Sequence, residues 1–482
     1  MEKIIGRQIE KNTLRMLYES DSPEFAAVYG RRRVGKTFLI REFFKNQFTF
    51  YHTGLSPYDI KKKKLKEEQL KSFAFSLSRY GMEDGKIPSD WMEAFQMLIK
   101  LLENKKTSGK KVVFLDEIPW MDTMKSGFLS ALEYFWNSWG SARNDLLLIV
   151  CGSATSWINN NLINNTGGLY NRLTRQIHLS PMNLNECETL LKSNGLTFSR
   201  YDIAQAYMVF GGIPYYLKMF QKGLSVAQNI DFILFRKNAE LAREFDRLFS
   251  SLFINPEDYI AIVTALAETR SGMNRKEIAA IAKSDGGGLT KILTSLEENG
   301  FIETRQDISR KKKNMRYCLT DSFCLFALQF SEHIGKDDKF WQATQNQPAT
   351  NAWKGFAFEN LCFNHIRQIK SALGIADVHS AIGTWTFKGD GSHDGAQIDM
   401  LIYRNDRVIN LCEMKFSVGE YTISKDYDRK LRSKIQSFID VIAPKESIQV
   451  TFITTYGLKG NQYSGIVQKT LDLDDLFQEV RG

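Results

Sequence analysis

Short apolar runs alternate with stretches of helical periodicity along the first 180 residues. Three runs have the composition of buried parallel strands, at 25–29, 111–115 and 146–151. Between these runs the apolar positions recur at helical spacing, as they do over 38–43. The alternation predicts an α/β domain with a doubly wound parallel sheet, and such sheets bind ligands at the carboxyl ends of their strands.

A phosphate-binding loop follows the first predicted strand. The pattern G-x-x-x-x-G-K-[ST] is fitted by Gly30, Arg31, Arg32, Arg33, Val34, Gly35, Lys36 and Thr37, and Phe38 opens the helix behind them. The glycines let backbone N–H groups surround phosphates, whose charge the helix N-terminus favours. We expect Lys36 to reach the β and γ phosphates and Thr37 to hold Mg²⁺. The pattern therefore predicts a Mg²⁺-dependent nucleoside triphosphatase.

Polar residues also end the other two predicted strands. Asp116 and Glu117 follow 111–115, and we expect Asp116 to bind Mg²⁺ through water and Glu117 to orient or deprotonate the attacking water. Ser153 follows the third strand, where a polar side chain can sense the γ-phosphate. The alternative for Asp116 and Glu117 is a structural acidic pair at a strand end. The alternative for Ser153 is a simple turn serine.

Further motifs carry a resemblance that covers roughly residues 1 to 220. These are Ile5–Glu10, Gly168–Arg175, Leu179–Met182 and Gly211–Pro214. In this order they resemble the archaeal-type ATPases of the AAA+ and STAND group. The resemblance implies ATP as the nucleotide, Gly6 and Arg7 near the base, and Arg172 or Arg175 at the γ-phosphate. Asn171 stands where the family usually has glycine before that arginine, so a surface role for the arginine stays open.

The middle of the chain has helical patterns followed by a hairpin. Residues 183–250 have the apolar spacing of a helical lid. Beyond Pro256 we expect three helices, at 259–266, 274–281 and 289–299, and a hairpin formed by 300–305 and 315–319, which together make a winged helix. The basic hairpin tip, 310–313, suits DNA phosphates. Base reading would fall to Thr290, Lys291, Thr294 and Ser295, and an inert interdomain module is the alternative.

A second predicted hairpin, 397–403 and 408–415, lies in the C-terminal part. It carries Asp399 on one strand, with Glu413 and Lys415 on one face of the other because side chains alternate. The stretch resembles the PD-(D/E)XK nuclease superfamily, with a restriction-endonuclease-like α/β fold. That resemblance implies Glu359, Asp399 and Glu413 as ligands of Mg²⁺ or Mn²⁺ and Lys415 as the catalytic lysine, with Gln436 a weaker candidate. The alternative is a charged hairpin with solvated salt bridges, and we interpret His393 and Asp394 as loop residues.

Composition and charge set the class of protein. With 482 residues, 43% hydrophobic and 25% charged, the chain is typical of multidomain globular proteins. Its six scattered cysteines fit core positions in a reducing cytoplasm, and neither a secretory signal nor a membrane span is expected. The net charge of +9 lies ahead of residue 351, and the run Lys61, Lys62, Lys63, Lys64 is interpreted as a solvated face. We divide the chain into an ATPase core (1–182), a helical lid (183–250), a winged helix (251–325), a linker (326–350) and a nuclease-like domain (351–482).

These features give one leading hypothesis and one rival. In the first, ATP closes the ATPase core against its lid and controls a C-terminal nuclease-like domain that acts on DNA or RNA. In the second, the chain is a regulatory or scaffold ATPase whose C-terminal domain only binds DNA or a partner protein. The sequence leaves open whether the chain forms a homo-oligomer. A small-molecule kinase is disfavoured, since no acceptor site can be named.

Overall fold

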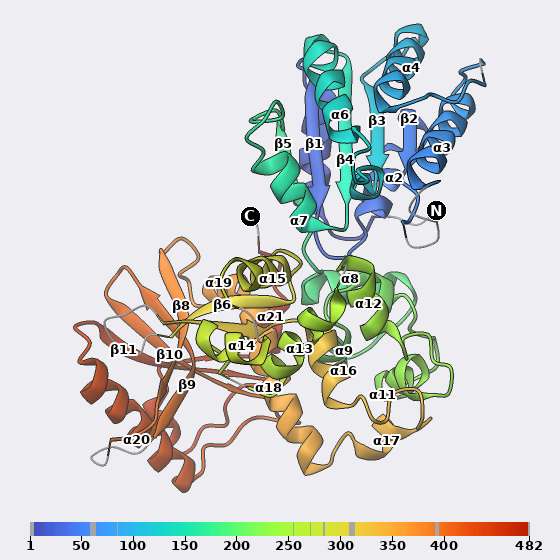
Figure 1. Cartoon of the computed structure of the whole chain (residues 1–482). Helices are drawn as coiled ribbons and strands as arrows, with labels where there is room; N and C mark the ends of the chain where they lie inside the picture. The colour runs from blue at the N-terminus through green and yellow to red at the C-terminus, as the bar shows by residue number, and fades with distance from the viewer. Residues whose placement is uncertain are drawn as a thin grey trace. The chain divides into compact units, whose positions relative to one another are not determined.

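The computed structural model describes residues 4–57, 64–83, 85–253, 255–269, 271–282, 285–307, 314–390 and 395–480. The chain divides into two compact units, Met1–Pro181 and Met182–Gly482, and each is described by itself (Figure 1). Among the described residues, no helix has both the length and the apolar character needed to cross a membrane.

Unit 1 contains a five-stranded parallel sheet in the order β2-β3-β4-β1-β5. Its strands are β1 (Glu24–Tyr29), β2 (Phe48–Thr53), β3 (Lys111–Asp116), β4 (Leu146–Gly152) and β5 (Arg175–His178). Its helices are α1 (Gln8–Glu19), α2 (Lys36–Phe44), η1 (Lys45–Gln47), α3 (Leu65–Arg79), α4 (Trp91–Asn104), α5 (Ile118–Met121), α6 (Phe128–Ser138), η3 (Gly140–Ala142), α7 (Thr155–Ile158) and η4 (Asn159–Ile163). The predicted parallel α/β sheet and its three central strands are confirmed.

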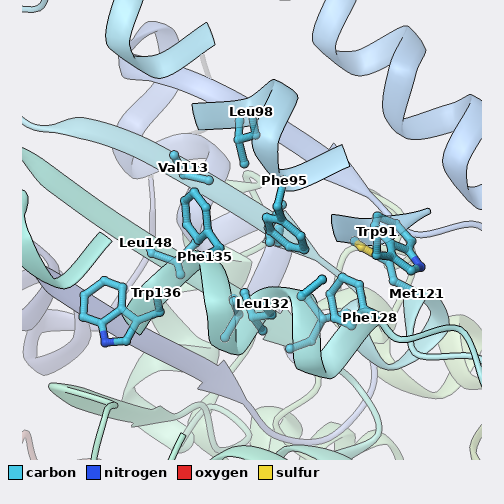
Figure 2. Close-up of a cluster of buried hydrophobic side chains, with 14 of the residues drawn as sticks. Trp91, Phe95, Leu98, Val113, Met121, Phe128, Leu132, Phe135, Trp136 and Leu148 are labelled. Atoms are coloured by element: carbon cyan, nitrogen blue, oxygen red, sulfur yellow. The ribbon is translucent and has the colours of Figure 1, made fainter. Parts of the chain in front are cut away.

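Helices cover both faces of this sheet. On one face, aromatic side chains of α4 and α6 interlock over Val113 and Leu148, as Figure 2 shows, with the rings of Phe95 and Phe135 centred 5.2 Å apart. On the other face, Phe44 of α2 contacts Phe48, which in turn stacks on Phe114 of β3. Because both faces are covered, the central strands β1, β3 and β4 are apolar along most of their length instead of alternating.

Unit 2 begins with helices. They are α8 (Leu184–Ser193), α9 (Arg200–Phe210), α10 (Pro214–Leu217), α11 (Val226–Ile230), η5 (Asp231–Phe235) and α12 (Glu244–Leu252). Three helices and two strands follow, namely α13 (Pro256–Ala267), α14 (Arg275–Ala282), α15 (Gly287–Glu298), β6 (Ile302–Asp307) and β7 (Asn314–Leu319). The winged-helix assignment of this segment stays a prediction. β6 and β7 pair antiparallel as expected. The basic tip of this hairpin, residues 310–313, lies outside the described residues, as do Lys61, Lys62 and Lys63.

Residues 326–350, for which we expected a linker, are helical over about half of their length and contain packed aromatic residues. The stretch holds the end of α16 (Ser322–Gln329), all of α17 (Phe340–Thr344) and the start of α18 (Pro348–Asn364). Trp341 is 1% exposed, and its ring lies 5.1 Å from that of Phe326 and 5.6 Å from that of Trp353. Although the stretch is polar in composition, it contains a few large aromatic residues, and their burial holds the backbone against the rest of unit 2.

A seven-stranded mixed sheet completes unit 2, in the order β12-β11-β10-β9-β8-β6-β7. Its other strands are β8 (Ser380–Phe387), β9 (Ala396–Arg404), β10 (Val408–Lys415), β11 (Ser447–Thr454) and β12 (Lys469–Leu471), with helices α19 (Ile366–Ala372), α20 (Lys425–Ile442), η6 (Ser464–Ile466) and α21 (Leu473–Leu476). β9 and β10 form the predicted hairpin. β6 pairs parallel with β8, so the β6–β7 hairpin and the C-terminal part share one sheet, which the sequence did not predict.

Candidate nucleotide site and C-terminal pocket

The loop after β1 is built around two glycines and a buried lysine. A Cβ on Gly30 would lie 2.4 Å from the carbonyl oxygen of Leu179, so only glycine fits there. Gly35 takes a left-handed φ of 96° where α2 begins. Lys36 Nζ donates to the carbonyl oxygens of Gly30 at 2.8 Å and Arg31 at 2.9 Å, and burial lowers the pKa of this ammonium. The loop thus holds its lysine against its own backbone carbonyls.

Thr37 and Asp116 meet at the carboxyl edge of the sheet. The Thr37 hydroxyl lies 3.1 Å and 3.0 Å from the two carboxylate oxygens of Asp116. Burial, and then the neighbouring charge of Glu117, raise the pKa of Asp116 to about 6. Paired hydroxyl and carboxylate oxygens are hard donors of the kind that Mg²⁺ prefers, so this pair fits the expected ion.

Glu117 is fixed by Ser153. The Ser153 hydroxyl lies 2.9 Å from each Glu117 carboxylate oxygen, and the Ser153 backbone N–H donates to one of them at 3.1 Å. Glu117 itself has a left-handed backbone φ of 51° at the start of α5, a conformation unfavourable for a residue with a Cβ. The structure therefore brings the predicted Ser153 into the site, as the residue that orients Glu117.

Two further residues at the carboxyl edge were not predicted. Cys151 on β4 is fully buried, and burial together with the nearby charge of Asp116 raises the pKa of its thiol. His178 ends β5 with its ring 5.2 Å from that of Tyr29, and burial and then the charge of Lys36 lower the pKa of its imidazole. Only their positions at strand ends could have indicated them from the sequence.

The remaining loop residues surround this centre. Arg7 is 6% exposed, and its guanidinium donates to the carbonyl oxygen of Val34 at 3.4 Å, so the segment that starts at Gly6 lies beside the loop. The position of Gly6 and Arg7 near the base stays a prediction. Arg31 is buried, whereas Arg32, Arg33 and Phe38 are partly exposed.

Neither candidate arginine has a side-chain hydrogen bond or ion pair to the loop among the described residues. Arg175 pairs with Ala26, in the first half of β1, whereas His178 pairs with Tyr29 at the carboxyl edge. Arg172 lies six residues before His178, and both arginines are exposed. At about 3.3 Å per residue, Arg175 lies roughly 10 Å from the edge that binds ligand.

A second site is a pocket of about 890 Å³ in unit 2. It is lined by Glu359, Gly395, Ala396, Gln397, Asp399, Lys415, Tyr427, Arg429, Lys430, Ser433 and Lys434. Three side chains expected to act together, Glu359 on α18, Asp399 on β9 and Lys415 on β10, thus face one cavity. Helix α20 adds a basic wall to it.

Glu413 is buried beneath this pocket at 2% exposure. It accepts a hydrogen bond from the Tyr427 hydroxyl at 2.7 Å and forms ion pairs with Lys434 and with Lys415, the latter at 3.5 Å. Burial alone would raise the pKa of Glu413, but the charges of Lys434 and Lys415 outweigh it and hold that pKa below its ordinary value. The carboxylate is already neutralised by protein groups.

This arrangement does not match the metal site expected at Glu359, Asp399 and Glu413. Within the described ranges, no three His, Cys, Asp or Glu side chains are grouped so that they could hold a metal ion. Gln436 also lies apart, since its amide donates to Asp440 on the exposed side of α20. His393 and Asp394 fall outside the part of the chain that the structure describes.

Within unit 2, helix α9 is joined to the strand that carries Lys415. The Tyr201 ring stacks on Phe416 at 5.0 Å and 15°, and on Tyr456 at 5.8 Å and 18°. The backbone N–H of Leu184, at the start of α8, donates to His365 Nε2 at 3.0 Å. The helices after residue 182 and the C-terminal sheet therefore share a packed, hydrogen-bonded boundary.

Comparisons with known proteins agree with the P-loop site. Residues 5–220 match the family described as ATPase domains predominantly from Archaea. An uncharacterized protein of Methanocaldococcus jannaschii, MJECL04, is 24% identical over 444 residues, which are 90% of this chain and 93% of that protein.

The chain is also similar to several solved structures. The Walker-type ATPase PABY2304 of Pyrococcus abyssi is 18% identical, with a TM-score of 0.46 over 68% of this chain and 96% of that one. The ORC2 protein of Aeropyrum pernix is 13% identical, with a TM-score of 0.41 over 71% of this chain and 95% of that one. The α/β fold class of unit 1 follows from its strand order and from the phosphate-binding loop between β1 and α2. Residues 5–220 are similar to ATPase domains found predominantly in Archaea.

Proposed function

We propose that the chain hydrolyses ATP in the presence of Mg²⁺ at the carboxyl edge of the five-stranded sheet. The observation that carries this proposal is the fixed carboxylate of Glu117, held by Ser153 beside the Thr37–Asp116 pair. A nucleotide-binding loop needs a lysine and a hydroxyl; hydrolysis also needs a group that positions water.

The protein groups have separate roles in this proposal. Lys36 leaves the carbonyl oxygens of Gly30 and Arg31 and takes phosphate oxygens instead, which suits a buried ammonium better than neutral acceptors do. Thr37 and Asp116 are the residues that would hold Mg²⁺, and the bound ion would neutralise phosphate charge. Glu117 orients a water for attack on the terminal phosphorus and accepts its proton, while Ser153 keeps the carboxylate in place. Arg172 and Arg175 are then candidates to act on the site of a neighbouring copy.

This assignment is tested by ATP binding and phosphate release. Lys36→Ala should lose ATP binding, whereas Glu117→Gln should retain it and lose hydrolysis. Equal phosphate release by wild type and Lys36→Ala would refute the assignment.

We further propose that nucleotide state controls the C-terminal domain as an ATP-driven switch acting on nucleic acid. The support is the pocket that gathers Glu359, Asp399 and Lys415, together with the Tyr201 stack that joins α9 to the strand of Lys415. Cleavage of supercoiled plasmid should be compared for wild type, Lys36→Ala and Asp399→Ala, with Mg²⁺ or Mn²⁺ and with or without ATP. Loss of cleavage in Asp399→Ala supports a nuclease, and identical cleavage by wild type and Lys36→Ala under all conditions refutes the switch.

A second candidate for this domain is nucleic-acid binding without cleavage. It is favoured by the pairing of Glu413 with Lys434, which occupies a carboxylate that a metal would need, and by the basic wall of α20. DNA retention at graded salt tests this candidate, because binding through phosphates must weaken as salt rises. Salt-sensitive retention with no cleavage by wild type would support binding alone.

A further inference from the structure

Three hydrogen-bond donors lie between the C-terminal pocket and the carboxylate of Glu413. Lys415, Tyr427 and Lys434 line the pocket, whereas Glu413 does not. The Tyr427 hydroxyl donates to Glu413 Oε2 at 2.7 Å, Lys434 Nζ donates to Oε1, and Lys415 Nζ lies 3.5 Å from Oε2. A molecule that enters the pocket therefore meets these donors before it meets the carboxylate.

The Lys434 ammonium takes the position that an ion bound to Glu413 would need. Metal ions such as Mg²⁺ require oxygen ligands, and protein donors already contact both oxygens of Glu413. A divalent cation would have to displace Lys434 and then lie beside the ammonium of Lys415, and like charges repel. The carboxylate thus binds a cation that belongs to the chain itself.

Lys415 and Lys434 differ from ordinary surface lysines. Their side chains are 27% and 22% exposed, and both are held by a carboxylate that is 2% exposed. An ammonium has three N–H donors. Within the described residues Glu413 is the one hydrogen-bond acceptor of Lys434, so two of its donors are left for a ligand in the pocket. Partly buried, anchored ammonium groups are suited to an oxyanion.

The charge and size of the pocket indicate which oxyanion. Four basic and two acidic side chains are among the described residues that line it, and three of the basic ones, Arg429, Lys430 and Lys434, belong to α20. The volume of about 890 Å³ is at the upper end of ordinary small-molecule sites. It has room for a phosphate group together with the nucleoside attached to it.

We propose that this pocket binds a phosphate group of a nucleic acid without a metal ion, and that Lys434 and Lys415 supply the positive charge. Glu413 holds the two lysines in place and does not contact the ligand. This inference rests on the nucleic-acid-binding candidate proposed above, and it adds the group that is bound and the cations that bind it.

The test uses the full chain carrying Lys36→Ala, so that the nucleotide loop does not contribute. Titration calorimetry with a thymidine dinucleotide that carries a terminal phosphate should show saturable binding in EDTA, and the same affinity when Mn²⁺ replaces EDTA. A dinucleotide without the terminal phosphate separates the two sources of the group. Unchanged affinity assigns the site to the phosphodiester, and lost affinity assigns it to a terminal phosphate. Binding that requires Mn²⁺, or no saturable binding, would overturn the proposal.

A double variant tests the lysine without leaving a buried charge unpaired. Adding Lys434→Met and Glu413→Gln together removes both members of the ion pair, so the chain should fold, as its unfolding midpoint will show. Affinity for the dinucleotide should fall roughly tenfold or more, the scale expected for one hydrogen bond to a charged group. Lys425→Ala, an exposed lysine of α20 outside the pocket, should leave affinity unchanged.

Failure of this inference can be distinguished from failure of the proposed nucleic-acid binding. If DNA retention is salt-sensitive but the double variant binds the dinucleotide as tightly as its background, nucleic-acid binding stands and the role of Lys434 is refuted. If neither DNA nor the dinucleotide is bound, both proposals are refuted.

Discussion

The hydroxyl of Ser153, at the end of β4, lies 2.9 Å from both carboxylate oxygens of Glu117, at the end of β3. The two residues are 36 positions apart in the chain and meet because β3 and β4 are parallel neighbours. Ser153, which would sense phosphate, and Glu117, which would position water, are therefore joined by hydrogen bonds. Movement of one on nucleotide binding must move the other.

Ser153→Ala should lower the rate of ATP hydrolysis more than the affinity for ATP. Without the hydroxyl, Glu117 keeps only the backbone N–H of residue 153 and samples unproductive orientations. A misplaced catalytic group costs up to about a hundredfold in kcat. Steady-state phosphate release and equilibrium ATP binding measure the two effects, with Ser153→Thr as the control that keeps a hydroxyl. An unchanged kcat would contradict this role.

The raised pKa of Asp116 predicts a pH dependence of stability without nucleotide. Its ordinary pKa is 3.8 and its folded value is about 6, so the folded chain holds this proton more tightly than the unfolded chain. This contribution to stability is complete below about pH 4 and is lost as pH rises through about 6. Asp116→Asn carries no such proton, so it should be more stable than wild type at pH 7, with a smaller difference at pH 4. Chemical denaturation at the two pH values checks this, and an advantage that grows toward pH 4 would contradict it.

Lys434→Met should destabilise the chain. Glu413 is 2% exposed, and removing Lys434 leaves its charge with Lys415 and Tyr427 alone. Breaking a fully buried ion pair costs about 3 to 5 kcal/mol. We expect a loss at or below the lower end of that range, because the Lys434 side chain is 22% exposed. Denaturant unfolding measures this cost. Adding Glu413→Gln should recover much of it, because the unpaired charge is removed.

Arg429→Ala is the matched control for that experiment. Arg429 also lines the pocket and belongs to α20, but it pairs with Asp426 where both side chains are 79% exposed. Solvent screens such a pair, so the midpoint of unfolding should not change measurably. If Lys434→Met also left the midpoint of unfolding unchanged, the Glu413–Lys434 ion pair would not contribute to the stability of the chain.

Tyr201→Ala should weaken the dependence of the C-terminal domain on nucleotide. The Tyr201 ring lies stacked against both Phe416 and Tyr456, so its removal loosens α9 from the strand that carries Lys415. Tyr201→Phe keeps the ring and should behave as wild type. The measurement is DNA retention or cleavage with and without ATP. A nucleotide effect that survives Tyr201→Ala at full size would exclude this contact as the coupling.

The phosphate-binding loop and its strand neighbours could be predicted because their signals are local. Glycine spacing, a lysine and an apolar strand run lie within a few residues of each other, and the structure has the loop between β1 and α2 as expected. The edge strand β5 is only four residues long and mostly exposed, so it lacks the apolar run that reveals a buried strand.

Contacts between distant residues could not be predicted from the pattern. Lys434 and Tyr427 reach Glu413 only because α20 lies across the sheet, and nothing in their local sequence specifies that direction. The parallel pairing of β6 with β8 likewise joins residues 77 positions apart, which no tight turn could connect. The sequence located Asp399, Glu413 and Lys415 on one hairpin, but which cation neutralises Glu413 depends on this tertiary packing.

Phosphate release from ATP by wild type and by Glu117→Gln tests the central claim most directly. Mg²⁺ should be present in excess, and ATP binding should be measured on the same samples. We predict that wild type releases phosphate, and that Glu117→Gln binds ATP as well but releases phosphate on the order of a hundredfold more slowly, the scale of losing a general base. Equal rates for the two proteins, or no release by wild type, would contradict the account.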